Sequence, residues 1–314
     1  MFRHREFRFS LASLIDALHL QERGRLPELK DPTSYSDKIQ WLKLHDQMIE
    51  QMIEQIICCD KLLARTFVSQ RIGKEFLLDL HHVSTRLDDP RFSEIEKPFM
   101  LKTNHDSGSV YRIETSHDLH RSLQSVAPRI QKPYGILTGE WAYYHIMPLV
   151  FAETMMAEPV VEYRFHCSDR AVKWVEIVKE RITGLPKVFF TNEAGRMLPL
   201  RLDGNVLHPG GQPERPVNWQ QMSEVARELS DGFRYVRIDL SKSEGRTYFG
   251  EMTFWPTAGF SSAKHDADFG DMLDIDLSFK RPSIHSEYRI AKNSRSYREI
   301  RRSELYQSLR PLGK

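Results

Sequence analysis

Residues 233–260 most constrain the fold, because two aromatic-rich apolar runs flank a short polar turn there. Each run carries one acid, Asp239 in the first and Glu251 in the second. If the two strands pair symmetrically about Gly245, these acids face each other across an antiparallel hairpin. Directly opposed side chains have Cβ atoms about 4.5–5.5 Å apart, so two carboxylates there repel unless a cation lies between them.

A divalent cation is the simplest such partner, since Mg²⁺ binds one or two carboxylates together with substrate phosphates. Side chains alternate along a strand, which places Arg237 on the face of Asp239 and Thr253 on the face of Glu251. The competing interpretation is a solvated acidic pair on an exposed sheet face, and for an isolated hairpin it is the better one. The rest of the chain favours the metal site.

The length of 314 residues is enough for a sizeable core, most simply in two lobes. No window approaches 18 uninterrupted apolar residues, and the N-terminus lacks a clean signal-peptide core. A cytoplasmic protein is therefore expected. Cys58, Cys59 and Cys167 fit that compartment, and their spacing is typical of neither a disulfide nor a zinc site.

The net charge of +2 hides an uneven distribution. Residues 280–314 carry ten Lys and Arg against three acids, a net charge of +7, which leaves −5 for residues 1–279. Such a tail suits an anionic partner: a polysaccharide, a membrane surface or nucleic acid. A solvated tail without a fixed partner is the alternative.

A second informative element is PFMLKTNHDSGSVYRI, residues 98–113. Lys102 lies in an apolar strand, on the face of Met100, and a loop of small and polar residues, 104–109, follows it. An ammonium group beside several backbone N–H groups is a typical phosphate site. The GxxxxGK[ST] pattern is absent, so this is no Walker A loop.

The order of these parts resembles the TupA-like ATP-grasp family of polysaccharide-biosynthesis proteins, over roughly residues 32–270. The resemblance is carried by PTSYSDKIQWLKLHD, CCDKLLART, PFMLKTNHDSGS, LVFAETMM, VEYRFHC, VARELS, YVRIDL and FGEMTFWPTAGF. It implies an α+β fold in which ATP lies between two α+β lobes. It also implies ligation of a carboxylate to an amine through an acyl phosphate, with ATP and Mg²⁺ as cofactors.

The resemblance also implies roles for individual residues. Asp239, Glu251 and Thr253 correspond to the Mg²⁺ site, and Arg164 and Arg237 to cations that face the transferred phosphoryl group. The run Pro256–Gly259 resembles a loop that helps to bind the acceptor carboxylate. The nucleotide contacts fall on Arg65, Lys102, Asn104, Ser107, Gly108, Ser109, Glu153, Thr154 and Met155.

Three departures from the family pattern matter. Thr253 replaces an Asn that many ATP-grasp ligases have, which weakens the case for a second metal. Arg65 replaces a lysine, which keeps the charge but changes the hydrogen-bond geometry. A helical segment of about 70 residues stands where a Rossmann-like first domain is usual.

We therefore expect four parts: a helical N-terminal segment (1–75), a lobe with the phosphate loop (76–155), a lobe with the metal hairpin (156–279) and a basic tail (280–314). The expected function is an ATP-dependent carboxylate–amine ligase that modifies a polysaccharide or its precursor. The tail is available for an anionic glycan or a membrane surface, and no specific nucleic acid is expected.

Two other functions stay open at this point. A glycosyltransferase with a metal-bound sugar nucleotide uses a DxD pair, which Asp266-Ala267-Asp268 and Asp274-Ile275-Asp276 both match. A non-enzymatic binding module could hold an acidic polymer with the tail, but this function leaves Lys102, Asp239 and Glu251 without a role.

Overall fold

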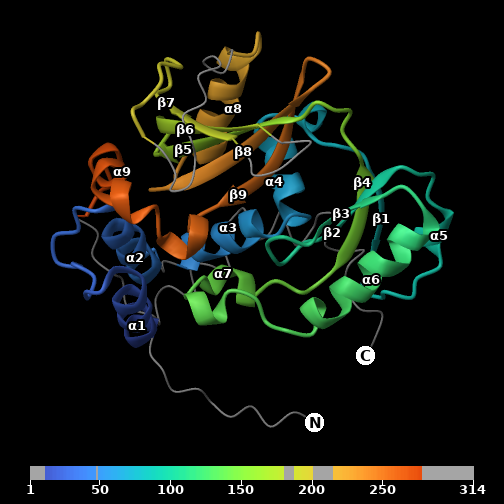
Figure 1. The fold of residues 1–314 in the computed structure, drawn as a ribbon, viewed down its shortest axis with the longest axis horizontal. Helices are drawn as coiled ribbons and strands as arrows, with labels where there is room; N and C mark the ends of the chain where they lie inside the picture. The colour runs from blue at the N-terminus through green and yellow to red at the C-terminus, as the bar shows by residue number, and fades with distance from the viewer. Residues whose placement is uncertain (1–10, 47–48, 180–186, 201–214, 278–314) are drawn as a thin grey trace.

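The computed structural model describes residues 11–46, 49–179, 187–200 and 215–277, so the basic tail, residues 280–314, lies outside the described part of the chain. Within that part, helices pack around two separate antiparallel sheets, as Figure 1 shows. The four N-terminal helices are α1 (Leu11–Arg23), α2 (Tyr35–His45), α3 (Ile49–Cys59) and α4 (Leu63–Arg71).

Local polar groups set the limits of these helices. Ser34 is the N-cap of α2, and its hydroxyl accepts a hydrogen bond from the N–H of Asp37. Between α3 and α4 the carboxylate of Asp60 accepts from the N–H groups of Leu62 (2.9 Å) and Leu63 (3.3 Å). Asp60 thereby satisfies two N–H groups at the start of α4 that have no partner within the helix.

The first sheet, sheet A, has the strand order β1-β4-β2-β3 with every pair antiparallel. Its strands are β1 (Leu80–Ser84), β2 (Phe99–Thr103), β3 (Val110–Ile113) and β4 (Val150–Thr154). The other elements between α4 and β5 in the chain are η1 (Lys74–Phe76), α5 (Arg91–Glu94), α6 (Ser116–Ile130), η2 (Ile136–Thr138) and α7 (Trp141–Tyr144). A small core of its own lies between this sheet and α6.

The second sheet, sheet B, has the order β7-β6-β5-β8-β9 and is also antiparallel throughout. Its strands are β5 (Val161–Ser168), β6 (Ala171–Lys179), β7 (Lys187–Thr191), β8 (Val236–Ser243) and β9 (Arg246–Thr253). The remaining elements are α8 (Trp219–Ser230), η3 (Pro256–Gly259), η4 (Ala263–His265) and α9 (Asp266–Met272).

One face of sheet B is covered by α8 (Figure 1). Trp219 of α8 packs against Tyr163 and Phe165 of β5, with ring centroids 6.0 and 5.6 Å apart. Because side chains alternate along β5, the residues between and beside these two point to the opposite face. There α2 brings Tyr35 to within 3.0 Å of the Tyr235 hydroxyl. The largest core of the described chain joins the N-terminal helices to sheet B.

The hairpin of β8 and β9 has the predicted pairing at its acids, although not at its turn. Its turn consists of Glu244 and Gly245, both with positive φ, and the next pair is Ser243 with Arg246. This tight turn shifts the register by one residue from symmetry about Gly245. A bulge at Gly250 restores it, so Asp239 does pair with Glu251.

Among the described helices, none combines the length and the apolar character that a membrane span requires.

Candidate active site

A row of charged side chains crosses sheet B on the face opposite α8. Through register pairs of neighbouring strands, Glu176 of β6 lies beside Arg164 of β5, Arg164 beside Asp239 of β8, and Asp239 beside Glu251 of β9. We call these four residues and Arg237 the carboxylate–arginine cluster. The sheet therefore brings together both predicted metal acids and both predicted cations.

In this structure the cation between the two acids is Arg237. Its Nε and Nη2 donate to the two carboxylate oxygens of Asp239 at 2.7 and 2.6 Å, and Nη2 also donates to Glu251 at 3.2 Å. The same Nη2 lies 3.3 Å from the hydroxyl of Thr253. The repulsion expected from opposed carboxylates is thus offset by a guanidinium group that contacts both.

The cluster nevertheless holds more negative charge than Arg237 offsets. Burial, together with the nearby Glu162 and Glu251, raises the pKa of Asp239 to about 7 against the lowering effect of Arg237. Glu251 has the opposite balance: burial favours its protonated form, but Lys61, Arg237 and Arg164 together lower its pKa. Asp239 is therefore the acid that most needs a further cation.

The donors present fit Mg²⁺. Two carboxylates and the Thr253 hydroxyl offer only oxygen atoms, the ligands that Mg²⁺ takes, and a nucleotide phosphate chain would complete the shell. No group of three or more His, Cys, Asp or Glu side chains in the described ranges is arranged to hold a metal.

Arg164 is held from three sides. It donates to Glu162 through Nε (3.0 Å) and Nη2 (2.7 Å), and it lies 3.6 Å from Glu176 and 3.9 Å from Asp239. Its side chain is 30% exposed, against 11% for Arg237. Arg164 is thus the cation of the cluster with more access to a ligand.

Beside the carboxylate–arginine cluster lies a buried, hydrogen-bonded histidine that the sequence did not predict as part of the site. Nε2 of His166 lies 3.1 Å from Glu176, Nδ1 lies 2.8 Å from the Tyr235 hydroxyl, and the imidazole stacks on Trp174. Burial favours protonation of Glu176, yet His166, Arg237 and Arg164 together lower its pKa to about 2. The only sequence signal was that His166 and Arg164 lie on one face of β5.

Glu176→Gln should lower stability at neutral pH by roughly 1–3 kcal/mol, with a smaller loss in acid. A carboxyl whose pKa is lowered on folding stabilises the fold above its unfolded pKa, near 4.5, and this contribution disappears as the pH falls toward 2. Gln resembles the protonated acid, so the free energies of unfolding of wild type and variant, measured with urea, should become equal at about pH 3. Glu244→Gln, in the exposed turn, is the matched control, and an equal gap at both pH values would contradict the assignment.

On sheet A the predicted nucleotide residues also meet. Nζ of Lys102 lies 2.5 Å from one carboxylate oxygen of Glu153, and Nη1 of Arg65 lies 3.5 Å from the other. Arg65 also donates to the carbonyl of Leu78. Lys102 and Arg65 therefore neutralise Glu153, and Lys102 is the more exposed cation, at 21% against 16%.

The predicted phosphate loop is the turn between β2 and β3. Asp106 organises it: its carboxylate accepts from Thr103, from Ser109 (2.5 Å) and from Arg129 (3.1 Å). Ser107 and Gly108 form the exposed tip, and Gly108 has a φ of 84° that favours glycine. This tip is the part of the loop that can meet a ligand.

Asn104 has a different place from the tip. Its amide donates to Asp60 (3.0 Å) and to the carbonyl of Met147 (3.1 Å), and its oxygen accepts from the N–H of Leu149 (2.7 Å). The side chain is fully buried. Asn104 thus anchors the loop to the start of α4 and the segment before β4.

Lys61 is a cation that the sequence reasoning missed. Its Nζ donates to the carbonyl of Asp106 in the phosphate loop at 2.5 Å and lies 3.6 Å from Glu251 in the hairpin. It therefore joins the loop of sheet A to the acids of sheet B. The available signal for Lys61 was its place next to Asp60 in CCDKLLART, the motif in which Arg65 is the predicted nucleotide contact.

The remaining predicted residues lie at the end of β4. The N–H of Thr154 donates to the carbonyl of Asp79 at 2.9 Å, and its hydroxyl lies 3.2 Å from His81. Met155, directly after β4, is half-buried. Thr154 is thus the last residue of β4, and Met155 begins the connector to sheet B.

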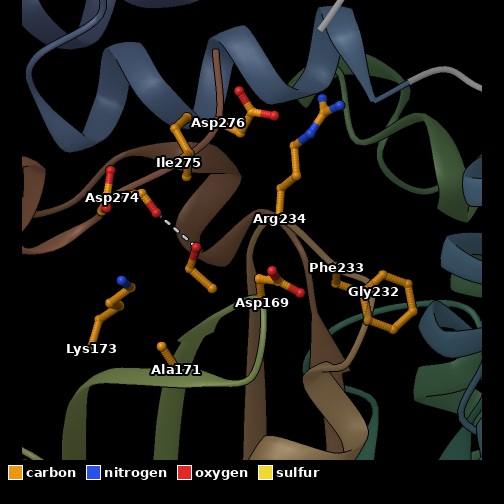
Figure 2. Close-up of a pocket in the computed structure, with 10 residues that line it drawn as sticks. Asp169, Ala171, Lys173, Gly232, Phe233, Arg234, Asp274, Ile275 and Asp276 are labelled. Carbon is orange, nitrogen blue, oxygen red and sulfur yellow. Dashed lines mark hydrogen bonds between the residues drawn. The ribbon is translucent and has the colours of Figure 1, made fainter. Parts of the chain in front are cut away.

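The two DxD pairs lie apart from the cluster. Asp266 is occupied by Ser36, whose N–H and hydroxyl donate at 3.0 and 2.6 Å, and by Arg23 at 3.5 Å. Asp274 and Asp276 line a cavity of about 530 Å³ together with Asp169 and Lys173, as Figure 2 shows. This cavity includes none of the residues predicted for the ATP or Mg²⁺ site.

A sequence profile of the family described as TupA-like ATPgrasp matches residues 37–274, well over half of the chain. The chain belongs to the TupA-like ATP-grasp family. The predicted resemblance and the predicted α+β fold are thereby confirmed, and membership makes the chain an ATP-grasp ligase. A search of curated proteins gave no match.

Solved structures similar to this TupA-like chain include three ligases or synthases. D-alanine–D-alanine ligase from Bacillus anthracis, complexed with ATP, has 14% identity and a TM-score of 0.42 over 75% of this chain and 68% of its own. L-amino acid ligase from Bacillus licheniformis has 12% identity and a TM-score of 0.44 over 74% and 53%. N5-carboxyaminoimidazole synthase from Aspergillus clavatus has 12% identity and a TM-score of 0.39 over 65% and 45%.

Proposed function

We propose that this chain joins a carboxylate to an amine at the expense of ATP, through an acyl phosphate, and that one of these substrates is a polysaccharide or its precursor. An amino acid or amine joined to a uronic acid is the form of the reaction we favour. The observation that carries the proposal is the opposed pair of Asp239 and Glu251, surrounded by Arg237, Arg164 and Lys61.

In this proposal Asp239, Glu251 and Thr253 would hold Mg²⁺, which when bound offsets the charge of the ATP phosphates. The substrate carboxylate attacks the γ-phosphorus, the bond to the bridging oxygen breaks, and ADP leaves. Arg164 and Arg237 offset the charge of the moving phosphoryl group. The amine then attacks the acyl carbon, inorganic phosphate leaves, and the amine loses a proton to form the amide.

The nucleotide would lie against sheet A. Lys102 would leave Glu153 for the phosphates, the tip of the phosphate loop would cover them, and Arg65 would keep Glu153 neutralised. Thr154 and Met155 would flank the base. Lys61 adds a cation at the point where the phosphate loop meets the hairpin. We place the reaction in the cytoplasm, where ATP is supplied.

Nucleotide choice tests this proposal against a glycosyltransferase. Calorimetry should show ATP binding that depends on Mg²⁺ and should show no comparable binding of UDP-sugars. We expect this preference because the acids would hold Mg²⁺ and the cations would contact a triphosphate. The DxD acid Asp266, by contrast, already bonds to Ser36 and Arg23. Binding of a sugar nucleotide without binding of ATP would overturn the proposal.

A further inference from the structure

The loop that follows β9 has a strained backbone. Thr257 (φ 52°, ψ 42°) and Ala258 (φ 55°, ψ 24°) are consecutive non-glycine residues in the left-handed region, which costs of order 1–3 kcal/mol each. The loop begins three residues after Thr253 of the candidate site. Such strain persists only where the surroundings enforce it, and it gathers where a protein contacts a ligand.

Two side chains of α2 enforce this conformation. Nζ of Lys43 donates to the carbonyl of Ala258 at 2.7 Å, and the amide of Gln40 donates to the same carbonyl at 3.2 Å. A Cβ placed on Gly259 would lie 2.7 Å from the Gln40 amide nitrogen and 2.8 Å from Cγ2 of Ile39. The helix therefore packs directly on the loop backbone.

Lys43 also contacts a second segment. The same Nζ donates at 2.8 Å to the carbonyl of Thr138 in η2, between α6 and α7. The Thr138 hydroxyl in turn donates to Glu140 at 2.5 Å. One buried ammonium group thus binds two segments that are distant in the sequence.

This arrangement is costly. The Lys43 side chain has no solvent exposure, and burial lowers its pKa to about 8, although Glu140 partly opposes the shift. A buried ammonium group is unfavourable unless it is paired and hydrogen-bonded. We call Lys43 and Gln40 the clamp on this loop. Within the loop, Thr257 is exposed, whereas Pro256 and Gly259 are buried, so the clamped loop presents Thr257 at the surface.

We propose that Lys43 and Gln40 are positioning residues that hold the Pro256–Gly259 loop in the conformation in which Thr257 contacts the carboxylate substrate. The carboxylate substrate in this proposal rests on the function proposed above. The hydrogen bonds by which Lys43 and Gln40 hold the loop do not depend on that function. The effect of Lys43 passes through the carbonyl of Ala258.

The test compares Lys43→Met with Lys38→Met. Lys38 lies on the same helix and also donates to two carbonyls, those of Gly270 and Leu273, both at 2.8 Å, away from the loop. Lys43→Met should speed amide hydrogen exchange of residues 257–260 by about tenfold or more, since a charged donor is lost. Lys38→Met should leave that exchange unchanged. Gln40→Met, which removes one donor, is a milder variant should Lys43→Met fail to fold.

A second readout separates positioning from general stability. With the carboxylate substrate found by screening, Lys43→Met should raise its KM about tenfold and change the affinity for ATP with Mg²⁺ less than about twofold. Lys38→Met should change neither, whatever it does to the Tm. If the wild-type protein consumes no carboxylate, the proposed function is wrong. The exchange experiment alone then tests whether Lys43 and Gln40 hold the loop. Unchanged exchange in both Lys43→Met and Gln40→Met would overturn the inference even if ligation is found.

Discussion

Asp239→Asn and Glu251→Gln are each expected to reduce ATP turnover by on the order of 10³-fold, because each removes a charged oxygen ligand worth several kcal/mol at the phosphates. Each replacement is nearly isosteric, and neither acid lies in the apolar core. The hairpin register also depends on the turn and the Gly250 bulge, and neither variant alters these. The fold should therefore survive, as circular dichroism and thermal melting can verify.

Glu244→Gln is the matched control for these two variants. It makes the same chemical change in the same hairpin, but Glu244 is exposed in the turn and away from the carboxylate–arginine cluster. Its turnover should equal that of wild type. Full activity in either Asp239→Asn or Glu251→Gln would exclude that acid from the metal site, and full activity in both would remove the metal site altogether.

Lys102→Met should weaken the binding of ATP with Mg²⁺ by about 2 kcal/mol, roughly 30-fold in Kd, because a charge-assisted contact to phosphate is lost. The methionine keeps the length of the chain on the strand. Glu153 still has Arg65 at 3.5 Å, so the variant does not leave a buried carboxylate without a cation. Calorimetric titration of ATP measures the effect directly.

The control for Lys102→Met is Lys132→Met, an exposed lysine just after α6. It lowers the net charge equally, so it corrects for any general attraction of the anionic nucleotide. A loss of affinity that is equal in the two variants would mean that Lys102 acts only through long-range charge. An unchanged Kd in Lys102→Met would remove it from the nucleotide site.

Alternation along strands was the part of the site that sequence reasoning captured best. The period of two places Arg237 with Asp239, and Lys102 with Met100, whatever the surrounding fold. The pairing of Asp239 with Glu251 was also predicted, but partly through two compensating features. The two-residue turn shifts the register by one, and the Gly250 bulge shifts it back. A glycine within a strand is a known signal of such a bulge.

Contacts between residues distant in the chain were beyond the same reasoning. Glu176 meets Arg164 because β6 pairs with β5, and Lys61 meets Glu251 because α4 packs near β9. Neither Glu176 nor Lys61 is unusual in its local sequence. The clamp of Lys43 on Ala258 spans more than 200 residues and depends on a buried lysine, which composition and periodicity predict to be exposed.

The most direct test of the proposed reaction is a turnover screen of the purified chain with ATP, Mg²⁺ and paired carboxylates and amines, uronic acids included, read by mass spectrometry. The account predicts ADP and inorganic phosphate in equal amounts, together with a product whose mass is that of acid plus amine less one water. Release of AMP and pyrophosphate, or transfer of a sugar from a sugar nucleotide with no consumption of ATP, would contradict it.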